Sequence, residues 1–319
     1  MTLTANTGEK LGIKGTSHEI DGDGDNISTD YWNETSVASV AKLWDLSATE
    51  REALIGLGTK LSRDYDNHRK TKPSEIVRFL RARPNDVKDA EEMFRNMMEW
   101  RQEHRVDTIL QDYTPPQELL QKYPGAVLRG VDRDGDPIYV GRVGVTDGVG
   151  MLRNYGHDEI IKHAIWIREM VSTGSWIQDY ENHAVNETPR IIKRITIIED
   201  CHGISLSTHM NRQLLNAYSD VMRLDQDNYP ETAKRLIIIR TPVIFRLVWS
   251  IIKHFFDKGV VDKMIFAGSS DYQEVLRQYM DLEVLPEEIA PGIGKGAAIP
   301  GMPPNFGGGP IEGSANGNI

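Results

Sequence analysis

Apolar residues recur at helical spacing through the first third of the chain, from residue 36 to about 106. Val40 and Trp44 lie one turn apart on one face of a predicted helix. Ser47, with Glu50 three residues later, is a capping-box signature and predicts the start of a second helix. The pattern therefore predicts a helical bundle at this end of the chain.

The longest predicted helix of this bundle follows Pro84, which ends the segment before it. We expect the Asn85 side chain to cap the new helix. One apolar stripe runs along this helix and is formed by Val87, Ala90, Phe94 and Met97. A single stripe of this kind favours packing inside the bundle.

The spacing of apolar residues changes after residue 116. Two short runs, 127–131 and 137–143, flank the acidic turn 132–136 and predict a β-hairpin. Farther along, predicted strands alternate with predicted helices. The strands are 194–201, 235–241 and 263–268, and the helices are 158–180, 210–224 and 242–256. This alternation predicts an α/β fold, with the helical bundle packed on a mostly parallel five-stranded sheet.

Composition divides the chain further. Its 319 residues carry 37 basic and 47 acidic side chains, a net charge of −10, and the first 34 residues hold two lysines against seven acids. We expect an acidic disordered tail, a helical region, an α/β domain and a Gly/Pro-rich tail, at 1–34, 35–112, 113–292 and 293–319. The acidic balance argues against nucleic acid as a partner, because few cations are left to neutralise phosphates.

The cysteine count and the hydropathy pattern bear on the compartment. Cys201 is the only cysteine, so no intrachain disulfide can form. The first residues contain no apolar segment typical of a signal peptide. No run approaches the roughly 20 apolar residues of a membrane-spanning helix. We therefore expect a cytoplasmic protein.

Motifs for catalysis and cofactor binding are weak. The chain has no glycine-rich dinucleotide fingerprint after its first strand, no G-x-S-x-G elbow, no H-E-x-x-H pair and no Cys/His pair at zinc spacing. The acidic run 21–25 lacks the glycine and glutamate of a calcium loop. Glu199, Cys201 and His202 meet at a strand end, which leaves an enzyme open as an alternative, although a polar turn explains them as well. We expect no enzyme activity, no cofactor and no metal.

The predicted helix 242–256 is apolar around nearly its whole circumference. Such a helix is either buried on every side or covers something apolar that is not protein. Arg246, Ser250 and Lys253 interrupt it with polar side chains that a fully enclosed helix avoids. The pattern favours a lid over an apolar cavity, with a central core helix as the alternative.

Five segments, in order across about residues 70 to 290, carry a family pattern. They are IVRFLRARPNDVKDAEEMFRNMMEWRQEHRVDTILQDY, DRDGDPIY, DQDNYPET, TPVIFRLVWSIIKHFFDKGVVDKMIFAG and LPEEI. They resemble the CRAL-TRIO lipid-binding family, particularly its fungal phosphatidylinositol/phosphatidylcholine-transfer branch. The resemblance implies helices that enclose a lipid cavity on the sheet and a mobile apolar gate helix. The gate residues are Phe245, Trp249, Ile252 and Phe256, of which we expect Phe245 and Trp249 to face outward.

The resemblance also implies a headgroup site. In that branch an arginine, a glutamate and a lysine hold the inositol phosphate, and they correspond here to Arg83, Glu231 and Lys263. Two cations can neutralise a phosphate, and a carboxylate can accept hydrogen bonds from inositol hydroxyls.

The residues that line the cavity and hold the second ligand depart from the branch. Tyr139 matches a tyrosine of that site, but Arg168 stands where the branch has another tyrosine. Ile195 and Ile197 replace hydroxyl residues on one face of a strand. Near the headgroup lysine, Val260 replaces a threonine. These changes disfavour phosphatidylcholine as the second ligand and favour a sterol or another apolar molecule.

The function implied by the resemblance is lipid binding and transfer. We expect a monomer that carries or presents phosphatidylinositol and a second hydrophobic lipid. It would associate peripherally and transiently with membranes, such as those of the Golgi or endosomes. The alternative is a binding or sensing module for a sterol- or retinoid-like molecule, without phosphoinositide transfer.

Overall fold

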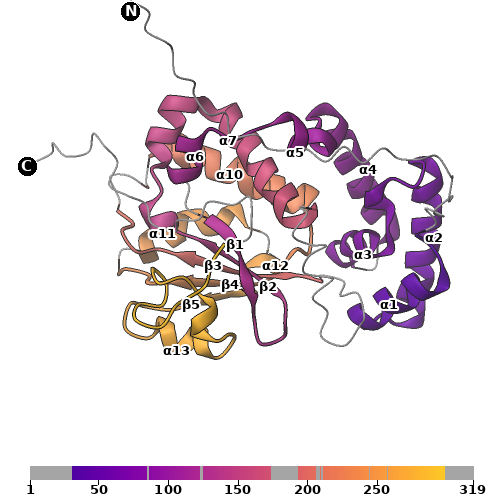
Figure 1. Cartoon of the computed structure of the whole chain (residues 1–319). Coiled ribbons are helices and arrows are strands. Elements are labelled where there is room, and N and C mark those ends of the chain that lie inside the picture. Colours follow the sequence, from indigo (N-terminus) through magenta and orange to yellow (C-terminus); the bar gives the residue numbers. More distant parts are fainter. Residues whose placement is uncertain are drawn as a thin grey trace, which may run out of the picture. The chain divides into compact units, whose positions relative to one another are not determined.

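The computed structural model (Figure 1) describes residues 31–84, 86–122, 125–173, 193–205, 209, 211–243, 245–256 and 258–298. All of them belong to one compact unit, Tyr31–Ile319. The predicted acidic tail up to residue 30, the acidic run 21–25 and the last 21 residues lie outside the described residues.

The predicted helical bundle forms from the first elements of this unit. They are α1 (Glu34–Trp44), α2 (Ala48–Asp64), η1 (Arg69–Thr71), α3 (Pro73–Ala82), α4 (Val87–Glu103), η2 (Val106–Thr108), α5 (Ile109–Asp112) and α6 (Gln117–Lys122). The capping box is confirmed, because the Ser47 hydroxyl accepts from the Glu50 amide and the Glu50 carboxylate accepts from the Ser47 amide. Phe79 and Phe94 pack edge to face, with ring centroids 5.1 Å apart, at the centre of the bundle.

The start of α4 differs from the prediction in two respects. Its cap is Asp86, whose side chain accepts from the Asp89 amide, and Asn85 lies outside the described residues. Val87 is 43% exposed, whereas Ala90, Phe94 and Met97 are buried. The stripe loses its first member because residue 87 stands at the helix end, where no other helix covers it.

The α/β prediction is confirmed. Five strands form one sheet in the order β1 (Gly125–Val131), β2 (Pro137–Gly141), β3 (Ile195–Asp200), β4 (Ala233–Ile239) and β5 (Met264–Phe266). β1 and β2 pair antiparallel as the predicted hairpin, and the other neighbours pair parallel. The chain also packs beyond residue 292, because Ala298 forms an antiparallel bridge with Leu128.

Helices connect the strands and follow the last one. They are η3 (Val143–Val145), α7 (Gly148–Thr173), α10 (Arg212–Asn228), α11 (Phe245–Ile252), η4 (Lys253–Phe255), α12 (Lys258–Val261), α13 (Tyr272–Arg277) and η5 (Leu282–Val284). The helix predicted at 158–180 begins ten residues earlier, at Gly148, and has a kink at Gly156 (φ 78°); its predicted end lies outside the described residues. The helix predicted at 242–256 is shorter, because its last turn tightens into η4.

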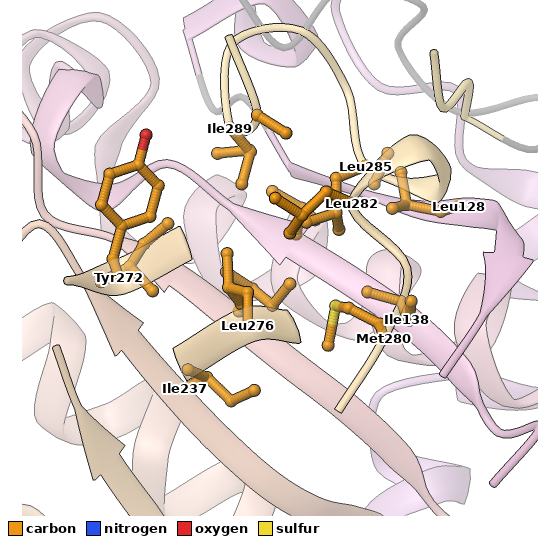
Figure 2. Close-up of a cluster of buried hydrophobic side chains, with 14 of the residues drawn as sticks. Leu128, Ile138, Ile237, Tyr272, Leu276, Met280, Leu282, Leu285 and Ile289 are labelled. Carbon is orange, nitrogen blue, oxygen red and sulfur yellow. The ribbon is translucent and has the colours of Figure 1, made fainter. Parts of the chain in front are cut away.

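One face of the sheet is closed by the C-terminal segment. Ile138, Ile198 and Ile237 are each fully buried on this face. Leu276 of α13 and the residues that follow it pack onto these strands (Figure 2). The residues that make this cover are Tyr272, Leu276, Met280, Leu282, Leu285 and Ile289. These side chains fill this part of the face with protein core.

The opposite face is covered incompletely. α7 and α10 lie on this side of the sheet, and α13 lies on the other (Figure 1). Tyr139, Ile197, Leu236 and Met264 occupy one row across four strands. Each of these side chains is only half-buried, although β3 and β4 are central strands. A central strand with helices on both faces is normally buried on both, so this face keeps accessible apolar surface.

A buried ion cluster joins the helical bundle to the α/β part. Arg101 on α4 donates to Glu169 on α7 at 2.9 Å, and each side chain is 1% exposed. Arg69 and the Tyr229 hydroxyl also donate to the Glu169 carboxylate, at 2.8 and 2.7 Å. Burial raises the pKa of Glu169, but Lys70, Arg101 and Arg69 outweigh it and lower the pKa to about 2.

We expect Arg101→Met to destabilise the protein by about 3–5 kcal/mol, because it leaves Glu169 buried with one partner fewer. Glu169→Gln should also destabilise it, and the two effects should not add in the double variant. Urea unfolding measures these differences. Lys60→Ala, which breaks the exposed pair with Glu91, is the control and should cost about 1 kcal/mol or less. Simple additivity of the two buried substitutions would contradict the coupling.

The same pair predicts a pH dependence. The folded pKa of Glu169, about 2, lies below its usual 4.5. Its contribution to stability is therefore present above about pH 4.5 and is lost as the pH falls through about 2. The gap in unfolding free energy between wild type and Glu169→Gln should shrink across that window. A gap that stays constant during acid titration would count against this role.

Candidate functional site

Glu231 stands at the centre of a charged cluster between α10 and β4. Its Oε1 accepts from Lys263 Nζ at 3.0 Å, and its Oε2 accepts from the Arg194 guanidinium. Its backbone carbonyl accepts from Arg78 on α3 at 3.0 Å. Glu231 itself has a positive φ of 55°. We call Arg78, Arg194, Glu231 and Lys263 the Glu231 cluster.

Cations outnumber anions in this cluster. Burial raises the pKa of Glu231, but Arg194 and Lys263 outweigh it, so the pKa is lowered and the carboxylate stays ionised. Lys193 and Arg194 both lie 4.9 Å from the Trp44 ring. Burial lowers the pKa of Lys193, and Arg194 lowers it further. Crowded cations with one carboxylate between them attract a further anion, such as a phosphate.

Two of the three predicted headgroup residues meet in this cluster. Glu231 and Lys263 do so directly. Arg83 ends α3, and its guanidinium donates to the Ala82 carbonyl at 3.0 Å. Within the described part of the chain, no ion pair is formed by Arg83. Its place beside Glu231 is taken by Arg78, earlier on the same helix.

Sequence reasoning missed Arg78 and Arg194. Arg78 is 153 residues from Glu231 along the chain, and Arg194 is 37 residues from it. The sequence signal for Arg194 was its position directly before the first residue of β3. Arg78 carried no comparable signal, because a lone arginine on a helix is usually a surface charge.

The predicted second-ligand residues lie on or above the incompletely covered face. Tyr139 and Ile197 are direct neighbours in the β2–β3 register. Ile195 is buried at the start of the same strand. Arg168 on α7 forms a bidentate pair with Asp225 on α10, at 2.7 and 2.8 Å. The floor of this face is therefore apolar at Ile195 and Ile197.

Glu199 follows Ile197 on the same face of β3 and was not assigned to this floor by sequence. Its Oε2 lies over Gly141, at 2.4 Å from the point where a Cβ of residue 141 would stand. Burial raises the pKa of Glu199 to about 7; the opposing field of Arg168 lowers it less, and Asp200 and Asp225 add to the rise. The absence of a side chain at Gly141 makes room for this carboxyl group.

A cavity of about 490 Å³ opens beside the gate helix α11. It is lined by Thr241, Pro242, Val243, Phe245, Trp249 and Phe266. The Trp249 ring packs edge-on against Phe266 of β5, with centroids 5.1 Å apart, and lies 6.1 Å from the Phe256 ring. Ile252 is half-buried on the same helix. The gate residues thus form an aromatic wall over the edge of the sheet.

The predicted outward face of this helix is wrong. Phe245 is 7% exposed, and its ring stacks with Trp249 and contacts Phe266. The exposed large apolar side chains described in this segment are Val243, Leu247 and Ile251, which are 93%, 52% and 37% exposed. Leu247 and Ile251 lie one turn apart on α11, and Val243 lies just before the helix. We call these three residues the apolar ridge. The aromatic rings turn inward because burying their apolar surface against the sheet is more favourable than leaving it in contact with water.

Comparisons with known proteins identify the family. The family described as CRAL/TRIO domain matches residues 121–290. Protein real-time of Drosophila melanogaster is 30% identical over 247 residues, which cover 77% of this chain and 36% of that protein. CRAL-TRIO domain-containing protein T23G5.2 of Caenorhabditis elegans is 30% identical over 219 residues, 67% of this chain and 29% of that protein. The chain belongs to the CRAL/TRIO domain family.

CRAL/TRIO domains bind lipophilic ligands, and the half-covered sheet face of this member suits such a ligand. The chain spans about a third of the length of these curated relatives. The crystal structure of Sfh5 is similar, with a TM-score of 0.47 and 16% identity, over 60% of this chain and 67% of that one.

Other chemistries find less support in this CRAL/TRIO domain. Burial raises the pKa of the Cys201 thiol, with Glu199 and Asp200 adding to the rise, so the thiol stays protonated and weakly nucleophilic. Asp200 accepts from the His202 amide and from Arg240. The described residues contain no cluster of three metal-ligating side chains. They also contain no helix that is long and apolar enough to cross a bilayer.

The raised pKa of Glu199 predicts how stability changes with pH. A carboxyl group whose folded pKa, about 7, lies above its usual 4.5 supports stability below 4.5 and loses that support as the pH rises through 7. We therefore expect Glu199→Gln to gain thermal stability over wild type as the pH rises from about 5 to about 8. The exposed Glu52→Gln is the matched control for the loss of one negative charge. If the melting temperatures of Glu199→Gln and Glu52→Gln, each measured relative to wild type, change in the same way across this pH range, the prediction is contradicted.

Proposed function

We propose that this domain carries or presents phosphatidylinositol and a second hydrophobic lipid. It would do so as a cytoplasmic monomer at membrane surfaces such as those of the Golgi or endosomes, without covalent chemistry. The observation that carries this proposal is the 3.0 Å pair between Glu231 and Lys263, within a cluster of excess cations. It lies in the same domain as an apolar sheet face that is only partly covered.

The Glu231 cluster suits an inositol phosphate chemically. Lys263 and Arg194 now share one carboxylate, and a phosphate would offer them more acceptor oxygens than Glu231 does. Glu231 would then be free to accept hydrogen bonds from inositol hydroxyls. Arg83 would join only if its guanidinium left the Ala82 carbonyl.

The acyl chains explain why a closed apolar site is needed. Two chains of roughly 15 methylenes each, at about 0.8 kcal/mol per methylene, make transfer through water unfavourable by about 25 kcal/mol as an upper bound. The half-buried row from Tyr139 to Met264 offers apolar surface for such chains. Exchange then requires α11 to move at a bilayer.

The outer surface of α11 supports membrane contact. The apolar ridge of Val243, Leu247 and Ile251 faces solvent. Lys253 and His254 are exposed directly after the helix. An apolar ridge followed by cationic or titratable groups fits a bilayer with anionic headgroups.

A second candidate is a binding or sensing module for a sterol- or retinoid-like molecule. The apolar floor at Ile195 and Ile197 favours it, because a bulky hydrocarbon needs no hydroxyl groups there. Mass spectrometry of lipids that co-purify with the protein separates the two functions. Recovery of phosphatidylinositol supports the first, and recovery of a sterol or retinoid alone supports the second.

We expect Lys263→Ala to weaken phosphatidylinositol loading roughly ten- to a hundredfold, because a hydrogen bond to a charged group contributes about 1.5–3 kcal/mol. Arg83→Ala should also weaken loading if that arginine turns to the headgroup. Lys258→Ala is the control, since this lysine is 86% exposed and, among the described residues, pairs with Asp262 alone. Loading from vesicles that contain labelled phosphatidylinositol measures the effect. Wild-type loading by the Arg83/Lys263 double variant would refute the headgroup site.

We expect Leu247→Asp to slow lipid exchange between vesicles by about tenfold or more, because it places a charge on the apolar ridge. Ser250→Asp adds the same charge to an exposed position of the same helix and is the matched control. Phe245→Asp should instead lower the melting temperature, since Phe245 is buried. If Leu247→Asp and Ser250→Asp exchange lipid equally fast, the ridge does not meet the membrane.

A further inference from the structure

Glu199 places one carboxyl group on an otherwise apolar floor. Ile195 and Ile197 precede it on the same face of β3. In the sheet it stands between Gly141 of β2 and Ile238 of β4. Gly141 has no side chain, and both carboxylate oxygens of Glu199 fill the space that a Cβ would take.

Among the residues that the structure describes, none forms a hydrogen bond or an ion pair with the Glu199 carboxyl group. The cation whose field acts on it is Arg168, which is held by both oxygens of Asp225. The neighbouring Asp200 points to the other face of β3 and is bound by Arg142 and Arg240. Glu199 is half-buried, and a carboxyl group that is partly removed from water without a partner costs stability. A role in binding therefore explains its presence better than packing does.

The position of Glu199 connects it with the cavity beside the gate. In the sheet register, Glu199 pairs with Ile238, and Ile238 pairs with Phe266. Neighbouring strands are about 4.8 Å apart, so about 10 Å separates the backbones of Glu199 and Phe266. Phe266 lines the cavity, and Ile238 packs against the gate residue Phe245. A hydrocarbon that reaches from the cavity along this row passes Phe266 and Ile238 and then meets the carboxyl group of Glu199.

We propose that Glu199 binds the hydroxyl group of a neutral lipid whose hydrocarbon body lies along the row from Ile238 to Phe266. This inference rests on the proposed lipid-carrying function and names the chemical class of the second ligand. A single hydroxyl both donates and accepts, which matches a protonated carboxyl group. A phosphodiester only accepts and carries a charge, so it fits this floor poorly.

The charge state of Glu199 gives the site a pH dependence. The charged groups that face it are Arg168 from α7, Asp225 from α10 and Asp200 from its own strand, and the Cys201 thiol lies next along the chain. With a pKa of about 7, the carboxyl group is largely protonated in mildly acidic solution. As the pH rises through 7, Glu199 ionises, and a bound lipid would then cover a charged carboxylate and remove its water. The affinity for the hydroxyl lipid should therefore fall.

The test compares octadecanol with octadecane, which differ only in the hydroxyl group and impose no ring shape on the cavity. Wild-type protein is loaded from phosphatidylcholine vesicles that contain one of the two labelled lipids, and the bound lipid is counted after gel filtration. We expect octadecanol to be retained about tenfold more than octadecane near pH 6. With octadecanol bound, the lipid hydroxyl and the Glu199 carboxyl group form a hydrogen bond, whereas with octadecane bound the covered carboxyl group has no partner.

Two variants decide the outcome. Glu199→Leu should abolish the preference while it keeps or improves octadecane retention. Glu199→Gln should keep the preference, since an amide also donates and accepts, and should remove its decline between about pH 6 and about pH 8. A preference that survives in Glu199→Leu overturns the proposal, and so does equal retention of both lipids by wild type.

Phosphatidylinositol loading is measured in parallel on the same variants. Lys263→Ala should lose phosphatidylinositol and keep the preference for octadecanol. Glu199→Leu should keep phosphatidylinositol, because Glu199 is not part of the Glu231 cluster. If the wild-type protein does not load phosphatidylinositol, the headgroup proposal alone is refuted. If the wild-type protein does not prefer octadecanol, the role of Glu199 alone is refuted.

Discussion

The need to cover both faces of one five-stranded sheet governs this structure. The C-terminal segment covers one face, with Ile198 and Ile237 fully buried beneath it. Helices α7, α10 and α11 cover the other face, but Ile197 and Leu236 remain only half-buried. Because apolar surface left in contact with water is unfavourable, the second face is the natural place for an apolar ligand. The aromatic wall of α11 and the carboxyl group of Glu199 both belong to this face.

Two charged clusters illustrate different uses of buried ions. In the first, Glu169 receives Arg101, Arg69 and the Tyr229 hydroxyl, so its acceptor capacity is well used. Such a cluster holds helices together and offers little to a ligand. In the second, Glu231 alone must balance Arg194 and Lys263. An uneven balance of this kind attracts an anion, which is why we assign binding to the second cluster and structure to the first.

Local features of the fold could be predicted closely. The capping box at Ser47, the hairpin and the alternation of strands with helices each depend on residues that are neighbours in the chain. Errors arose at the ends of elements. Asp86 caps α4, and α7 starts before a kink at Gly156, because side-chain caps and glycine kinks compete with the average periodicity. The resemblance to a family supplied Glu231 and Lys263, which the structure brings within 3.0 Å of each other.

The element types, the mostly parallel sheet and the apolar character of α11 can all be predicted from the chain, because periodicity and hydropathy are local properties. Packing between distant segments sets the direction in which that helix faces, with Phe245 turned inward and Leu247 outward. The same packing brings Arg78, rather than Arg83, to Glu231 from 153 residues away. A helix that is apolar all round has no preferred side until a sheet packs against it, and a long-range contact is specified by packing rather than by chain neighbours.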